Sequence, residues 1–156
     1  TILGLDEKIK KSLHIHEKHK SAKDGMDLAL CSINMDSLEL EFCGANNPLY
    51  LIRNGELKVF EPNKGSVGSM HETSNLISHN WQLLKGDLIY MFSDGYLDQF
   101  GGEKGKKFMR KRFQNLLLDN WRLDMKEQQE VLNNNIATWM GKHKQVDDML
   151  VIGIKI

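Results

Sequence analysis

The sequence predicts one α+β domain in which antiparallel sheets are flanked by helices. Strand-like apolar runs come mostly in hairpin pairs, and helix-like segments lie at the start and towards the end of the chain. That order favours an α+β arrangement over a doubly wound one, in which strands and helices would alternate. A chain of 156 residues fits a single domain with a sizeable core.

The expected elements follow from apolar periodicity and turn residues. Helices are predicted over 1–18, 104–119 and 124–140, and strands over 26–33, 38–43, 49–53, 56–60, 76–84, 88–93 and 149–156. The first strand is nearly all apolar, so we expect it to be buried on both faces or to lie under a helix. Asn54-Gly55 between two strands is the strongest hairpin signal, because both residues tolerate a positive φ.

Composition and charge exclude several classes of protein. The chain has 21 Lys and Arg against 21 Asp and Glu, which argues against nucleic-acid binding through bulk electrostatics. The apolar stretches fall far short of the roughly 20 residues of a membrane helix, and no secretory signal precedes them. Cys31 and Cys43 lie in strand-like runs, where we expect buried free thiols of a cytoplasmic protein, or of the cytoplasmic part of a larger signalling protein.

Acidic residues stand at the ends of two predicted strands. Ser93-Asp94-Gly95 ends the strand 88–93, and Asp147-Asp148 precedes the strand 149–156. If these strands pair antiparallel, Asp94 and Asp147 share one rim of the sheet. Such carboxylates repel one another unless a cation compensates, and Mg²⁺ and Mn²⁺ prefer oxygen ligands. The alternative interpretation is that the acids only cap turns at the strand ends.

Four motifs, taken in order, resemble one protein family. They begin at Asp24 (DGMDLALC), Phe42 (FCGANNPLYLIRNG), Ser93 (SDGYLDQFGG) and Gln145 (QVDDMLVIG), with Val67-Gly68 and Lys85-Gly86-Asp87 between them. Together they resemble the SpoIIE-type branch of the PPM family, the metal-dependent serine/threonine protein phosphatases. The resemblance covers 24–156 and implies layered antiparallel sheets flanked by helices.

The resemblance implies a two-metal phosphatase in bacterial signal transduction. It would hydrolyse phosphoserine or phosphothreonine on a phosphorylated regulatory protein, such as an anti-sigma-factor antagonist. Two Mn²⁺ or Mg²⁺ ions would hold the attacking water, so no side chain is expected to be the nucleophile.

The same motifs imply the site residues. Asp94 and Asp147 would be metal ligands, with Asp148 as an alternative to Asp147. Gly95 would let a backbone carbonyl or a bound water approach closely. The residues in supporting positions would be Asp98, Ser93 and Asn46. For Asn46, stabilisation of its own polar loop is the alternative.

One family motif is missing from the sequence. The family places its first metal-binding acid and a following Gly on an upstream strand, and nothing in Thr1 to Lys23 matches that pair. Asp24-Gly25 has the right letters but aligns with a later strand. We therefore expect 1–156 to be a single, N-terminally truncated phosphatase domain with half of the metal shell. A missing strand would expose a sheet edge, and such an edge favours a homodimer.

A competing hypothesis is a non-catalytic PPM-like binding or regulatory module, which keeps the scaffold and loses metal and turnover. The missing upstream acid favours this hypothesis for the chain as given.

Three other features have two interpretations each. The close histidines His14, His16 and His19 indicate a solvated basic helix end or a metal site. Arg53 is a surface residue or contacts phosphate. The basic run from Lys104 to Arg112 is a solvated helix face or a docking surface for an acidic, phosphorylated partner.

Overall fold

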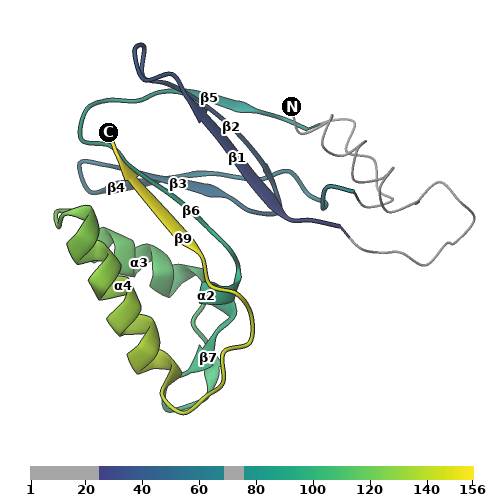
Figure 1. The fold of residues 1–156 in the computed structure, drawn as a ribbon, viewed down its shortest axis with the longest axis vertical. Helices are drawn as coiled ribbons and strands as arrows, with labels where there is room; N and C mark the ends of the chain where they lie inside the picture. The colour runs from purple at the N-terminus through teal and green to yellow at the C-terminus, as the bar shows by residue number, and fades with distance from the viewer. Residues whose placement is uncertain (1–24, 69–75) are drawn as a thin grey trace, which may run out of the picture. The chain divides into compact units, whose positions relative to one another are not determined.

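The computed structural model of the chain describes residues 25–68 and 76–156 (Figure 1). The predicted helix over 1–18, the histidines His14, His16 and His19, and Asp24 lie outside the described residues. The described residues divide into two compact units, one formed by 25–49 with 60–68 and 76–84, and the other by 50–59 with 85–156. Among the described residues, no helix is both long and apolar enough to cross a membrane.

The first unit is built on a three-stranded antiparallel sheet in the order β1-β2-β5. Its strands are β1 (Leu28–Ile33), β2 (Glu39–Ala45) and β5 (His79–Gln82). In the turn between β1 and β2, Asn34 Oδ1 accepts the backbone N–H groups of Asp36 at 2.9 Å and Ser37 at 3.0 Å. The Asn side chain thus closes the predicted hairpin connection.

The burial of β1 differs from the prediction. No residue of β1 is fully buried, and Leu30 is 46% exposed, so the predicted burial on both faces is wrong. Because β1 stands at the end of its sheet, it is an edge strand in the described part of the chain and not a central one. Cys31 and Cys43 are free, as predicted, but only half-buried. Burial raises the pKa of both thiols, which makes them weak nucleophiles.

The second unit is built on a four-stranded sheet in the order β4-β3-β6-β9. Its strands are β3 (Leu49–Arg53), β4 (Glu56–Phe60), β6 (Leu88–Phe92) and β9 (Val151–Lys155). The chain turns from β3 to β4 at Asn54, with φ 53°, and Gly55, with φ 82°. These positive φ angles confirm the predicted hairpin.

Three helices are described: α2 (Gly95–Asp98), α3 (Arg110–Asn120) and α4 (Met125–Met140). The last of them confirms the predicted helix over 124–140. Its start is set by a capping box, in which Asp124 Oδ1 accepts the Glu127 N–H at 2.7 Å and Glu127 Oε2 accepts the Asp124 N–H at 3.0 Å. Such a box satisfies two helix-end donors at once.

The predicted helix over 104–119 begins too early. The residues before α3 form a small hairpin of β7 (Phe100–Gly101) and β8 (Lys106–Lys107). Gly102 and Gly105 have φ angles of 65° and 56°, and Met109 has a φ of 75°. A right-handed helix cannot pass through positive φ angles, so α3 starts only after Met109.

The core of the second unit joins its sheet to α3 and α4, which lie on one face of the sheet (Figure 1). Phe92 from β6 contacts Tyr50 from β3 and Phe113 from α3, with both pairs of ring centroids 4.8 Å apart. Tyr50 and Phe113 are fully buried. Each such side chain stabilises the fold by roughly 1.5–3 kcal/mol.

Candidate functional site

The antiparallel pairing of β6 and β9 brings the two acidic segments together. In the register of this pair, Phe92 lies opposite Val151, so the end of β6 faces the start of β9. The backbone N–H of Ser93 donates to the Leu150 carbonyl at 3.0 Å, which extends the ladder by one step. The predicted antiparallel pairing is therefore present, and both acidic segments lie at one rim of the sheet.

Ser93 ties this rim together with its side chain. Its hydroxyl donates to the Asp148 carbonyl at 2.7 Å and accepts the Leu150 N–H at 3.0 Å. One hydroxyl can serve as donor and acceptor at once. Ser93 thus has a structural supporting position beside the carboxylates.

Gly95 packs directly against the backbone of the other segment. A Cβ atom at Gly95 would clash with the Asp148 carbonyl oxygen and lie 2.9 Å from the Asp148 carbonyl carbon and 3.2 Å from that of Asp147. Only a residue without a side chain permits this approach. The structure gives Gly95 a packing reason that does not depend on a metal.

The carboxylates of Asp94, Asp147 and Asp148 are exposed at the rim. Asp147 Oδ1 accepts the backbone N–H of Asp148 at 2.7 Å, and the Asp147 carbonyl accepts the Gln145 side chain at 2.8 Å. Asp94 stands at the N-cap of α2, but its carboxylate does not cap that helix. The Asp147 carboxylate thus makes the local hydrogen bond that the turn-capping alternative predicts, and the Asp94 carboxylate does not cap its helix.

These donors fit Mn²⁺ or Mg²⁺ in kind but are too few for a complete site. Carboxylate oxygens are the ligands that both ions prefer. Within 25–68 and 76–156, however, no three His, Cys, Asp or Glu side chains are grouped so that they could hold a metal ion. The rim would therefore supply only part of a metal shell.

Asp98, predicted as a supporting residue, is bound to a lysine. Lys107 Nζ lies 2.7 Å from Asp98 Oδ2, and both side chains are partly exposed. The pair fastens β8 to the C-terminal end of α2. Whether Asp98 also supports a metal stays a prediction.

Asn46 belongs to the other unit, where it stabilises its own loop. Its side chain donates to Asp27 Oδ1 at 2.9 Å and accepts the Gly65 N–H at 3.0 Å. Ser66 donates to the same Asp27 oxygen at 2.6 Å. The contacts of Asn46 match the loop-stabilising alternative, and its supporting role at the metal site remains a prediction.

Gln99 organises the rim from beneath, and sequence reasoning missed it. This fully buried side chain donates to the Lys144 carbonyl at 3.0 Å and accepts the Val146 N–H at 3.3 Å. The backbone carbonyl of Gln99 accepts the indole N–H of Trp139 at 3.0 Å. It thereby fixes the segment that leads into Asp147. The one signal for Gln99 in the sequence was its position, as a polar residue between Asp94 and the pair Gly101-Gly102.

The Arg53 side chain is 28% exposed and contacts a carboxylate, and its predicted contact with phosphate stays a prediction. Its Nε lies 2.8 Å from Asp87 Oδ1 and its Nη2 2.6 Å from Asp87 Oδ2. This hydrogen bonding raises the pKa of the guanidinium. The Asp87 side chain is only 1% exposed. The pair joins β3 to the residue that precedes β6, so it positions the strand that carries Asp94 at its other end.

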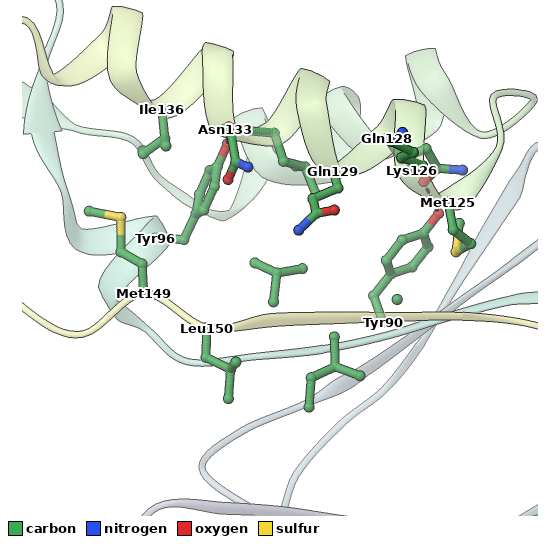
Figure 2. A pocket seen from close by; sticks show the side chains of 14 residues that line it. Tyr90, Tyr96, Met125, Lys126, Gln128, Gln129, Asn133, Ile136, Met149 and Leu150 are labelled. Carbon is green, nitrogen blue, oxygen red and sulfur yellow. Dashed lines mark hydrogen bonds between the residues drawn. The ribbon is translucent and has the colours of Figure 1, made fainter.

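A groove of about 710 Å³ lies between α4 and the β6–β9 edge of the sheet (Figure 2). At its floor, the buried hydroxyl of Tyr90 donates to Gln128 Oε1 at 2.6 Å. Tyr96 donates to the Leu132 carbonyl at 2.9 Å. Burial raises the pKa of both phenols. None of the candidate carboxylates lines this groove, although Met149 and Leu150, which directly follow Asp148, do.

The comparisons with known proteins settle the family. The family described as stage II sporulation protein E (SpoIIE) matches residues 5–156. The chain belongs to the SpoIIE family. A comparison with curated proteins finds no match.

Several solved structures are similar to this SpoIIE-family chain. The SiaA-PP2C domain of Pseudomonas aeruginosa is 26% identical with a TM-score of 0.86, and the match covers 99% of this chain and 59% of that one. The phosphatase domain of the cell fate determinant SpoIIE from Bacillus subtilis is 18% identical with a TM-score of 0.65, covering 100% and 73%. The RsbU and RsbW domains of Rv1364c from Mycobacterium tuberculosis are 17% identical with a TM-score of 0.64, covering 93% and 40%.

These matches confirm the predicted α+β fold of the PP2C type. The Bacillus domain has also been solved after presoaking with Mn, with a TM-score of 0.65 to this chain. The chain spans 59% of the Pseudomonas domain.

Proposed function

We propose that this chain is part of a metal-dependent protein serine/threonine phosphatase of the SpoIIE family that acts in bacterial signalling. The observation that carries the proposal is the junction of Asp94-Gly95 with Asp147-Asp148, which gathers exposed carboxylates at one sheet rim. The partner we propose is a phosphorylated regulatory protein, such as an anti-sigma-factor antagonist. Because Cys31 and Cys43 are free thiols, we place the reaction in the reducing cytoplasm.

The rim residues have distinct tasks in this proposal. Asp94 and Asp147 hold Mn²⁺ or Mg²⁺, with Asp148 as the alternative to Asp147. Two such ions, once bound, supply an activated water and neutralise charge on a phosphate monoester. Gly95 and Ser93 keep the two acidic segments in contact, and this order limits the reorganisation that metal binding requires.

Calorimetric titration with Mn²⁺ tests this proposal. It is applied to the chain alone and to the chain extended by the sequence that precedes it in its gene. Asp94→Asn should weaken Mn²⁺ binding and metal-dependent hydrolysis of a phosphoserine peptide by at least about tenfold, since a metal ligand is removed. Asp119→Asn, which changes an exposed acid on α3, is the matched control and should change neither. Equal effects of both variants would sink the proposal.

The second candidate function is a non-catalytic PPM-like binding module. It is favoured by the absence, among the described residues, of a three-ligand metal group. If neither version of the chain binds Mn²⁺ while both stay folded, this second function replaces the first.

We further propose that two copies pair through the open edge of β9 in the chain as given. Among the residues that the structure describes, β9 is the last strand of its sheet, and Ile152 on it is 42% exposed. An apolar edge strand offers unpaired backbone groups to another strand. Light scattering at increasing concentration should report a dimer, and a monomer at high concentration would contradict this pairing.

A further inference from the structure

Two basic segments that lie far apart in the sequence meet in the second unit. The backbone N–H of Gly102 donates to the Trp139 carbonyl at 2.8 Å. A Cβ at Gly105 would lie 3.5 Å from the His143 ring. The β7–β8 hairpin therefore lies beside the segment that leaves α4, as Figure 1 shows.

Positive charge is concentrated where these segments meet. The hairpin and the first turn of α3 contain one acid, Glu103, and carry Lys104, Lys106, Lys107, Arg110, Lys111 and Arg112. The segment 141–146 adds Lys142, His143 and Lys144 and contains no acid. Apart from half-buried Lys107, all of these side chains are exposed. We call these nine residues the basic surface.

Not every charge of the basic surface is equally available. Lys107 is bound to Asp98, and the Arg112 guanidinium lies 4.2 Å from the centre of the Trp139 ring. These contacts hold the surface in place. Lys106, Lys142 and Lys144 are exposed around them.

The basic surface adjoins the acidic rim along the chain and through one ion pair. Its second segment runs directly into Asp147, and the Lys107–Asp98 pair joins the hairpin to α2, which follows Asp94. A chain of zero net charge thus places a local cationic field next to its candidate metal ligands. Such a field attracts anionic ligands and orients their approach.

We propose that the basic surface docks an acidic segment of the phosphoprotein substrate, beside its phosphorylated residue. This inference rests on the proposed function and names the chemistry of its partner. A protein partner is favoured over nucleic acid because the same segments also carry exposed apolar side chains, with Met109, which precedes Arg110, 57% exposed and Phe100, opposite Lys107 in the hairpin, 39% exposed. Mixed charge and apolar exposure is typical of protein interfaces.

A binding measurement without metal separates this proposal from the phosphatase proposal. The probe is a fluorescent peptide with one phosphoserine followed by four glutamates, compared with the same peptide carrying glutamines. The test variant of the chain is Lys106→Glu/Lys142→Glu/Lys144→Glu. The matched control is Lys85→Glu/Lys126→Glu/Lys155→Glu, which reverses three exposed lysines elsewhere in the same unit. Thermal unfolding checks that both variants keep the fold.

The docking proposal expects the acidic peptide to bind the test variant about tenfold more weakly than the unchanged chain, because three exposed charge contacts that each contribute modestly are lost together. The control variant should bind the peptide with little change in affinity. Affinity should also fall with added salt. Equal losses in both variants, or no preference for glutamate over glutamine, would overturn it. So would tighter binding of a short DNA duplex of equal charge. If the extended chain binds the peptide but does not hydrolyse it once Mn²⁺ is added, the phosphatase proposal is refuted and the docking proposal stands.

Discussion

Gly95 touches the peptide group of Asp148, so the end of β6 and the start of β9 meet without an intervening side chain. The Ser93 hydroxyl closes the same junction by its 2.7 Å hydrogen bond to the Asp148 carbonyl. Packing of this kind leaves little room for adjustment. The spacing of the acidic rim therefore depends on a glycine as much as on the carboxylates.

Gly95→Ala should separate the two acidic segments. The added Cβ would clash with backbone atoms, which cannot rotate away, so we expect a loss of about 1–3 kcal/mol in the free energy of unfolding. Mn²⁺ affinity should fall as well. The control is Gly153→Ala in β9, where the nearest atom, Met125 Sδ, is 3.4 Å from the added Cβ. Urea unfolding that gives the two variants equal stability would contradict the packing argument.

Gln99→Leu should loosen the segment that leads to Asp147. The substitution removes hydrogen bonds to the Lys144 carbonyl and the Val146 N–H in a buried place. Leaving such groups without a partner costs about 1–3 kcal/mol. Hydrogen exchange should become faster over 144–148, whereas Gln129→Leu, at an exposed residue of α4 in the groove, should leave it unchanged. If hydrogen exchange over 144–148 is unchanged in the Gln99 variant, Gln99 does not position this segment.

Removal of Arg53 should cost more than removal of its partner. Arg53→Met takes two hydrogen bonds from a carboxylate that is 1% exposed, whereas Asp87→Asn leaves a guanidinium that is 28% exposed and can reach water. Breaking a fully buried pair from one side costs about 3–5 kcal/mol. This pair is half-buried, so we expect a smaller loss from either side, and the greater loss when the buried carboxylate is the charge left behind. A double-mutant cycle measured by denaturant unfolding gives the coupling. Equal losses for the two single variants would argue against this asymmetry.

Stability should fall in alkali because of Tyr90. Burial raises the pKa of Tyr90 from 10.0 to about 12. The hydrogen bond to Gln128 lowers this pKa, but its effect is smaller than that of burial. Below pH 10.0 both the folded and the unfolded phenol are protonated, so this contribution is fully present. As the pH rises the unfolded state ionises first, and the contribution is lost up to about pH 12.

Tyr90→Phe should therefore reduce the alkaline loss of stability. At neutral pH the same variant should be destabilised by about 1–2 kcal/mol, because Gln128 Oε1 loses its donor. Urea unfolding followed across the alkaline range measures both effects. An alkaline loss as steep as that of the unchanged chain would assign the effect to other groups, among them Tyr96, whose pKa burial also raises.

Local signals predicted most of the elements correctly. Asn54-Gly55 predicted its hairpin and the 124–140 pattern predicted α4, because a turn with positive φ and a capping box are decided by neighbouring residues. The predicted start of α3 was wrong because two positive φ angles, at Gly105 and Met109, interrupt an otherwise helical pattern. The predicted burial of β1 was wrong because an apolar run of residues does not show whether a strand is central or at the edge of its sheet.

The sequence by itself determined the fold class, the family motifs and the acids at two strand ends, since all of these are patterns of nearby residues. Only the tertiary structure decided which distant groups meet. It joined Gly95 to Asp148, Gln99 to Lys144, Arg53 to Asp87, and one basic segment to another. The physical reason is that such contacts depend on sheet register and helix packing, which one-dimensional spacing does not encode.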